Sequence, residues 1–271
     1  MLLIVPTFNN PTYVRNFVNQ VNSLDKFDLM IVDNNSNFQE MIELLQQLEN
    51  EQIKVIKLNK NYGPRWIYED YSFFNSLPQK FCISDPDIKF NAELPIDFLD
   101  VMFEIGDVFR MGKVGFAIEN CLNSITKDPI KVGQVTTSIF DYERQFWDKS
   151  RMIQQEIFPV DLFLAPIDTT FSCHNKTWFQ AKLSQDAIRV AGNYVCKHLP
   201  WTNEVVLPEN EKLNYMKFSK HSYFSGLRSD DGEPFMHMSF TNYYDLINEI
   251  SILKSKKSLK YRLKRVLSKW C

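Results

Sequence analysis

The sequence is poor in the residues that build the common phosphate loops and covalent crosslinks. Its 271 residues include only eight glycines. Neither Gly-x-Gly-x-x-Gly nor Gly-Lys-Ser/Thr occurs, so a dinucleotide-binding loop or a P-loop is not supported. The five cysteines are odd in number, widely spaced and without a Cys-x-x-Cys pair, which argues against a disulfide framework and a zinc cluster. This cysteine usage favours a reducing cytoplasm.

Long apolar runs are also missing. No stretch approaches the roughly 18 apolar residues that a membrane span requires. Residues 1–7 are apolar but few, and no basic region precedes them, so we expect a first strand there and not a signal peptide. With 44% hydrophobic and 24% charged residues, the composition is that of an ordinary globular chain that can bury a large core.

The near-neutral charge conceals an uneven distribution. Eight Lys or Arg and no acidic residue lie between residues 254 and 271, which leaves 23 basic against 33 acidic residues in the rest of the chain. The apolar residues of 259–270 fall on one helical face, so we predict a basic amphipathic helix at 251–271 lying on an anionic membrane surface. The alternatives are a helix packed on the body, a disordered end, or a nucleic-acid contact, against which the acidic body counts.

The first 90 residues alternate between strand and helix patterns. Expected strands are 2–5, 27–32, 53–58 and 81–85, and expected helices are 13–24, 41–48 and 66–77. Strands separated by helices predict a parallel sheet with right-handed crossovers. The loops that follow the strands are polar and meet at the carboxyl edge of the sheet, where open α/β folds bind ligands.

Two aspartates, Asp85 and Asp87, leave the end of the fourth strand one residue apart. Carboxylate oxygens in this position suit Mg²⁺ or Mn²⁺ shared with a diphosphate. Arg65, in the loop after the third strand, is a cation that can meet phosphate charge. The alternatives are a turn shaped by Pro86 for the two aspartates, and a surface arginine at a helix start for Arg65.

Four short motifs together resemble the nucleotide-binding half of a GT-A glycosyltransferase of the family-2-like kind. They are Ile4-Val5-Pro6-Thr7-Phe8-Asn9, Ile31-Val32-Asp33-Asn34-Asn35-Ser36, Asn59-Lys60-Asn61-Tyr62-Gly63 and Ser84-Asp85-Pro86-Asp87. Each motif is weak alone, but their order and spacing are specific. The likeness covers about the first 90 residues and is thinner beyond residue 100.

The resemblance implies a nucleotide-sugar donor and roles for particular residues. Asp33 would hydrogen-bond uracil or ribose, Asp85 would contact the ribose or the donor sugar, and Asp87 would bind Mn²⁺ or Mg²⁺ beside the leaving diphosphate. The donor-binding residues that it implies are Pro6, Thr7, Asn9, Asp33, Gly63, Arg65 and Asp85.

The resemblance also implies a general base in the second half of an inverting enzyme. Asp168, which lies 81 residues after Asp87, is our choice, because apolar neighbours would raise its pKa toward the working range. The alternative is a turn aspartate that caps a following threonine, with Asp161 and Glu143 as other candidate bases. His198 is a candidate third metal ligand or, alternatively, a packed histidine.

The expected fold is α/β: a GT-A fold with a Rossmann-like half, a mostly parallel sheet, a smaller acceptor-binding region and C-terminal helices. We expect one catalytic domain at 1–250, with a donor half at 1–90 and an acceptor half at 91–250, followed by the helix at 251–271. The expected enzyme is cytoplasmic and peripheral on the inner face of the cytoplasmic membrane.

The expected activity is transfer of one sugar, with inversion and divalent metal, from a UDP-sugar to a saccharide or glycolipid acceptor of a bacterial surface glycan such as lipooligosaccharide or capsule. Two alternatives stay open. One is a non-catalytic nucleotide- or glycan-binding module with this fold. The other is a nucleotidyltransferase, although residues 6–11 lack the glycine-rich basic loop that such enzymes use.

Overall fold

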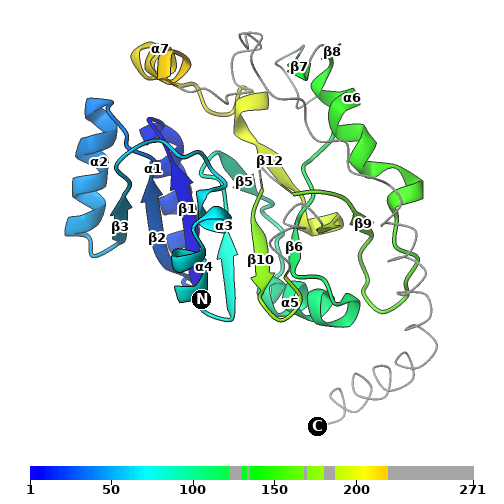
Figure 1. The fold of residues 1–271 in the computed structure, drawn as a ribbon. Helices are drawn as coiled ribbons and strands as arrows, with labels where there is room; N and C mark the ends of the chain where they lie inside the picture. Colours follow the sequence, from blue (N-terminus) through cyan, green and yellow to red (C-terminus); the bar gives the residue numbers. More distant parts are fainter. Residues whose placement is uncertain (122–129, 133–134, 168–169, 180–186, 219–271) are drawn as a thin grey trace.

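The computed structural model describes residues 1–121, 130–132, 135–167, 170–179 and 187–218. In the donor half, strands and helices alternate along the chain as the sequence predicts (Figure 1). The strands are β1 (Leu2–Thr7), β2 (Asp28–Asp33), β3 (Lys54–Lys57) and β4 (Lys80–Ile83). The helices between them are α1 (Pro11–Asn22), α2 (Gln39–Asn50), α3 (Trp66–Glu69) and α4 (Tyr71–Ser76).

The second half mixes short strands with helices. Its strands are β5 (Ile88–Phe90), β6 (Lys113–Phe116), β7 (Ile130–Val132), β8 (Val135–Thr137), β9 (Leu162–Leu164), β10 (Ser172–Asn175), β11 (Ile188–Val190) and β12 (Cys196–His198). Its helices are α5 (Phe98–Phe109), α6 (Ile139–Arg144) and α7 (Glu209–Phe218). The expected basic helix at 251–271 lies outside the described residues. Within the described part of the chain, no helix is long and apolar enough to cross a membrane.

One large sheet runs through both halves in the order β3-β2-β1-β4-β10-β6-β11-β9. The first four strands are parallel, as expected. Strand β10 is antiparallel to both of its neighbours, β4 and β6, and β9 is antiparallel to β11. The fold is therefore a mixed α/β structure whose donor half has a parallel sheet, and its carboxyl edge holds the loops after β1, β2 and β4.

Alternation of side chains along the strands divides the core into two layers. On one face Leu3 and Val5 pack with the apolar stripe of α1, with α2 and with α5. On the other face Ile4, Met30 and Phe81 pack with α3 and α4. Because side chains point alternately to the two faces of a strand, continuous apolar runs such as that of β1 are buried on both sides.

Local features of the sequence determine where two helices, α4 and α5, begin. The helix expected at 66–77 is divided into α3 and α4 at Asp70, which has extended backbone angles and whose carboxylate accepts a hydrogen bond from the Phe73 N–H, 2.9 Å away. Such a cap satisfies one of the free N–H groups at the start of a helix. Helix α5 begins at Phe98, after Pro95, and the residue before a proline is disfavoured in a helix.

Candidate functional site

The loops after β1 and β2 are joined by Asn9. This residue is 0% exposed and has φ +51°, a left-handed conformation that asparagine tolerates better than most residues. Its Oδ1 accepts from the Asn37 and Phe38 N–H groups at 2.9 and 3.0 Å, and its Nδ2 donates to Asn37 Oδ1 at 2.8 Å. The side chain predicted to lie near the base and ribose is thus committed to holding the two loops together.

Asp33 ends β2 and is 3% exposed. Its carboxylate accepts hydrogen bonds from the Ser36 N–H at 3.0 Å and the Ser36 hydroxyl at 2.5 Å. Burial raises the pKa of Asp33, although the bonds from Ser36 and the charge of Lys57 oppose the rise. The Asn34 N–H donates to Thr7 O at 2.9 Å, so the ends of β1 and β2 are fixed against each other.

Asn34 was not among the predicted site residues. It is 4% exposed, and its Oδ1 has no hydrogen-bond partner among the described residues. Buried amides normally find partners, so this oxygen at the carboxyl edge is an acceptor that a ligand could satisfy. The sequence signal was present, because Asn34 lies within the second predicted motif, next to Asp33, but the orientation of its side chain required the structure.

The loop after β3 places Gly63 and Arg65 at the start of α3. Gly63 has φ +84°, which favours glycine, and its N–H donates to Asn61 Oδ1 at 2.9 Å. Arg65 is exposed at the N-cap of α3. Burial and the charge of Asp85 raise the pKa of Tyr68, whereas the charge of Arg65 lowers it. Asp85 and Arg65 are therefore both close enough to Tyr68 to shift its pKa.

Asp87 and His198 come together through a small ribbon of two antiparallel strands, β5 and β12. In this ribbon Ile88 is the partner of His198, and the Leu199 N–H donates to Asp87 O at 2.8 Å. His198 Nε2 lies 3.4 Å from Asp87 Oδ2. The ring of His198 packs edge-on against Trp201, with centroids 4.5 Å apart.

The pair is largely buried and has two polar atoms without a partner among the described residues. The side chains of His198 and Asp87 are 8% and 19% exposed, and Asp87 Oδ1 and His198 Nδ1 lack hydrogen-bond partners among the described residues. No group of three or more His, Cys, Asp or Glu in the described ranges could hold a metal. A Mn²⁺ or Mg²⁺ ion, which also takes phosphate and water oxygens as ligands, fits such a donor set.

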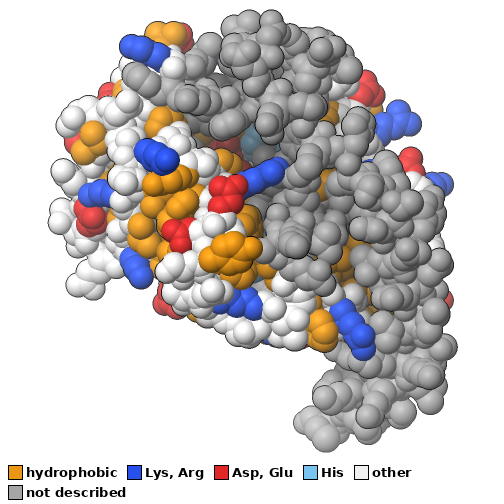
Figure 2. Space-filling view, in the orientation of Figure 1, with side chains coloured by type: hydrophobic (Ala, Val, Ile, Leu, Met, Phe, Trp, Pro, Cys, Tyr) orange, Lys and Arg blue, Asp and Glu red, His pale blue; other side chains and the backbone are white. Residues whose placement is uncertain are grey.

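The surface around this edge is mixed in charge. Figure 2 shows acidic and basic side chains next to each other near the centre of the face, and a histidine in a hollow beside them.

The N-terminal ends of α1 and α2 are contacted by α7. Glu211 is 2% exposed, and its carboxylate accepts from the Thr12 N–H at 3.1 Å and the Thr12 hydroxyl at 2.6 Å.

The candidate bases have different surroundings. Asp168 lies outside the described residues. Glu143 is 1% exposed and forms an ion pair with Arg189, which is 2% exposed. Asp161 is exposed. The ion pair of Glu143 is therefore structural in character, because its carboxylate already has a buried cationic partner.

Residues 2–66 match the model of the family described as Glycosyl transferase family 2. No curated protein matches the sequence. Among solved structures, S. aureus TarS is 19% identical and has a TM-score of 0.33, over 48% of this chain and 24% of TarS. A mannosyltransferase of Pyrobaculum calidifontis, PcManGT, is 10% identical and has a TM-score of 0.46, over 95% of this chain and 86% of that chain.

GalNAc-T7, solved with UDP, GalNAc and Mn²⁺, is 9% identical and has a TM-score of 0.43, over 95% of this chain and 56% of that chain. The present chain spans about a quarter of the length of TarS. The family match covers the strands and loops that carry the first three predicted motifs. The predicted resemblance is confirmed by the glycosyl transferase family 2 pattern in residues 2–66, and the described residues form the predicted α/β fold with a parallel sheet among the first four strands.

Proposed function

We propose that this enzyme transfers a single sugar from a UDP-sugar to a saccharide acceptor and that it depends on a divalent metal. The observation that carries the proposal is the Asp87–His198 pair at the carboxyl edge of the sheet, with a 3.4 Å separation and an unpartnered buried atom on each side chain. Buried polar atoms that lack partners are costly. A metal ion bound by Asp87 would satisfy its Oδ1, and His198 Nε2, the ring nitrogen that faces this carboxylate, is the second candidate ligand.

The nucleotide is proposed to lie against the loops after β1 and β2. Asn34 Oδ1, a buried acceptor that lacks a partner among the described residues, suits the N3–H of uracil. Pro6 and Thr7 form the adjoining wall, and Asp33 reaches the ribose through its remaining lone pairs. In this arrangement Asn9 sets the shape of the loops by its own hydrogen bonds.

The diphosphate is proposed to extend from this edge toward Asp87, with Arg65 and Gly63 on the opposite loop. Asp85 contacts the ribose or the donor sugar, while Asp87 and His198 hold Mn²⁺ or Mg²⁺. The metal supplies positive charge to the diphosphate as it leaves. Arg65 adds a second positive charge at the same oxygens.

The acceptor half is proposed to bring a saccharide hydroxyl to the anomeric carbon of the donor sugar. The hydroxyl oxygen forms the new glycosidic bond as the bond from that carbon to the diphosphate breaks. Asp168 takes the hydroxyl proton, and the diphosphate leaves with the electron pair of the broken bond. Attack from the face opposite the leaving group inverts the anomeric configuration.

The division of the chain into two halves and the kind of acceptor are part of the proposal. Residues 1–90 form the donor half and 91–250 the acceptor half. The acceptor is proposed to be a lipid-linked bacterial surface glycan, such as lipooligosaccharide or capsule, reached from the inner face of the cytoplasmic membrane. The support is the basic amphipathic pattern of 251–271, which suits an anionic membrane surface.

Release of UDP from a panel of UDP-sugars, with Mn²⁺ and with chelator, tests the proposal. We expect metal-dependent release that falls at least a hundredfold in Asp87→Asn, because a metal ligand is lost. Asp100→Asn, an exposed aspartate in the first turn of α5, is the matched control and should behave as the wild type. Pyrophosphate release from a nucleoside triphosphate would instead indicate a nucleotidyltransferase, and binding without turnover would indicate a binding module.

A further inference from the structure

The ribbon of β5 and β12 determines where Asp87 lies, yet it is small. Each strand has three residues, and an isolated pair of strands is only marginally stable in water. The proposed metal ligands sit at its end, where Ile88 is paired with His198. Because a shift of one residue turns side chains to the opposite face, other contacts must keep the ribbon in register.

Strand β12 is tied to the main body by its backbone. The Cys196 N–H donates to Ala117 O at 2.9 Å, and the Glu119 N–H donates to Cys196 O at 2.7 Å. These bonds continue the line of β6 and place Cys196 beside Ile118. His198 is thus attached to the large sheet through main-chain hydrogen bonds.

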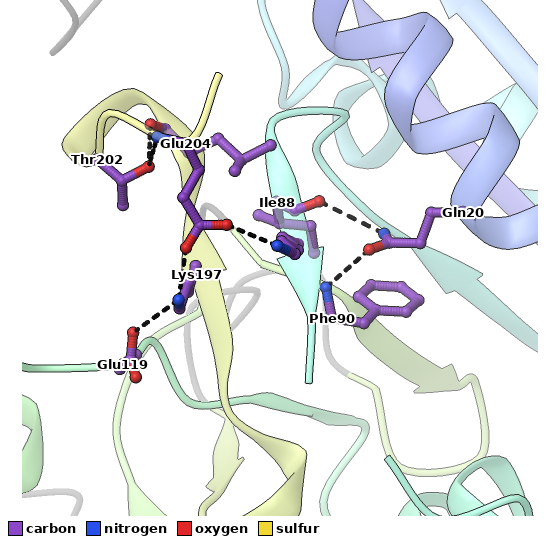
Figure 3. Close-up of polar contacts among 9 residues, drawn as sticks. Gln20, Ile88, Phe90, Glu119, Lys197, Thr202 and Glu204 are labelled. Atoms are coloured by element: carbon purple, nitrogen blue, oxygen red, sulfur yellow. Dashed lines mark hydrogen bonds and ion pairs between the residues drawn. The ribbon is translucent and has the colours of Figure 1, made fainter. Parts of the chain in front are cut away.

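Strand β5, which carries Asp87 at its start, is held on its other side by one side chain of α1. Gln20 Oε1 accepts from the Phe90 N–H at 2.9 Å, and Gln20 Nε2 donates to Ile88 O at 3.4 Å (Figure 3). An amide offers one acceptor and one donor group. Gln20 therefore pairs with the free edge of β5 as a neighbouring strand would.

A second contact joins the two strands across their exposed face. Lys89 and Lys197 are direct register partners, and like charges in that position repel. Glu204 lies between them and accepts from Lys89 Nζ at 2.6 Å and from Lys197 Nζ at 2.5 Å (Figure 3). Hydrogen bonds from Lys197 and then Lys89 lower the pKa of Glu204.

The turn after β12 delivers Glu204 to this position. The Thr202 hydroxyl donates to Leu199 O at 3.0 Å and accepts from the Glu204 N–H at 3.2 Å. Lys197 also lies 3.9 Å from Glu119. Glu204 consequently connects a lysine on the strand of Asp87 with a lysine on the strand of His198.

We propose that Gln20 and Glu204 are positioning residues for the metal site, because together they hold β5 in register on β12 and so keep Asp87 against His198. The inference rests on the proposed function for its metal, but the support of β5 by these side chains is a separate claim about the ribbon.

The test uses Gln20→Met and Glu204→Gln in the full-length protein, with calorimetric titration of UDP with and without Mn²⁺. The matched controls are Gln47→Met, an exposed amide on α2, and Glu49→Gln, which removes an exposed 2.8 Å ion pair to Lys57. We expect the Mn²⁺-dependent gain in UDP affinity to fall about fivefold to tenfold in each ribbon variant, the size of one or two hydrogen bonds. Metal-free UDP affinity and both controls should stay within about twofold of the wild type, a change too small for the loss of one hydrogen bond.

Amide hydrogen exchange over residues 88–90 is the second readout, and it needs no ligand. Faster exchange in Gln20→Met and Glu204→Gln, with wild-type exchange in the controls, supports the positioning role. Unchanged exchange, or an unchanged Mn²⁺-dependent gain in UDP affinity, overturns it, as does an equal loss of metal-free affinity. If the wild type shows no Mn²⁺-dependent binding of UDP, the proposed function fails, and exchange at 88–90 alone then decides whether these side chains hold the ribbon.

Discussion

The buried ion pair between Glu143 and Arg189 should dominate the stability of the acceptor half. The two side chains are 1% and 2% exposed. Arg189 Nε also donates to Pro166 O at 2.8 Å, and its guanidinium lies 4.2 Å from the centre of the Phe146 ring. The pair therefore ties α6 to β11 and to the segment that follows β9.

Removing either partner leaves the other charge in the interior without the opposite charge that it faces in this pair. Such a change costs about 3–5 kcal/mol, so we expect Glu143→Leu and Arg189→Met each to lose that much stability. Removing both partners removes both of these buried charges, and Pro166 O loses its hydrogen bond from Arg189, which costs about 1–3 kcal/mol. The double variant should consequently be more stable than either single variant.

Urea unfolding at 25 °C, followed by circular dichroism, measures these differences. The folded protein should persist in all three variants, because domains of this kind have about 5–15 kcal/mol of stability. An unchanged slope of the free energy of unfolding against urea would show that the comparison is valid. A double variant that loses the sum of the two single losses would refute the reasoning, as would a loss below about 1 kcal/mol, the size of one net hydrogen bond, for Glu143→Leu.

Three further predictions concern single residues. Burial raises the pKa of Glu211, so the protonated form of this side chain favours folding. The stability of the wild type relative to Glu211→Gln should therefore be greatest below the ordinary pKa of glutamate and should fall as the pH rises through the raised pKa. Thermal unfolding of both proteins across pH 4–8 tests this, and a stability difference that rises with pH would contradict it. Gly112→Ala would place Cβ 2.3 Å from Phe179 Cα, so we expect overpacking to lower the free energy of unfolding by about 1–3 kcal/mol. Urea unfolding measures this loss, and a wild-type midpoint would show that the backbone moves apart without cost. Asn9→Gly keeps the left-handed φ but removes three side-chain hydrogen bonds. We therefore expect the free energy of unfolding to fall by about 2–3 kcal/mol and UDP to bind more weakly. Unchanged UDP binding would show that these bonds do not shape the nucleotide loops.

The donor half could be predicted from the sequence because its signals are local. Each of its first strands is a run of apolar residues followed by polar turn residues, and each long helix has a buried stripe at helical spacing. Parallel strands joined by helices have few possible arrangements. The resemblance in four motifs then indicated which edge of the sheet carries the donor-binding residues.

The second half depends on contacts between distant residues, which patterns along the chain do not reveal. Strand β10 lies between β4 and β6 in antiparallel orientation, and no local feature of its four residues indicates that place. The same holds for Gln20, whose spacing on α1 predicts only a partly buried polar residue. Its hydrogen bonds reach Ile88 and Phe90 on β5, which lie 68 and 70 positions further along the chain.

Only part of the candidate site could be predicted from the sequence, because contacts between distant residues also place some of its side chains. Asp85 and Asp87 follow a recognisable strand, so their place at the carboxyl edge could be foreseen. The position of His198 against Asp87 follows from the register of β12 on β5, which the sequence does not display. Asn9 was predicted to lie near the nucleotide, and the structure places its side chain in contacts between two loops.

The central claim is that the carboxyl edge binds a nucleotide together with a metal at Asp87. Thermal unfolding of the wild type and of Asp87→Ala, with UDP, GDP or CMP and with or without Mn²⁺, tests it most directly. A ligand that binds only the folded state stabilises it by about 2.7 kcal/mol at a hundred times its Kd. We predict that UDP with Mn²⁺ raises the unfolding midpoint of the wild type by several degrees and that Asp87→Ala loses the metal-dependent part of this shift. No shift with any nucleotide under either metal condition would contradict the account.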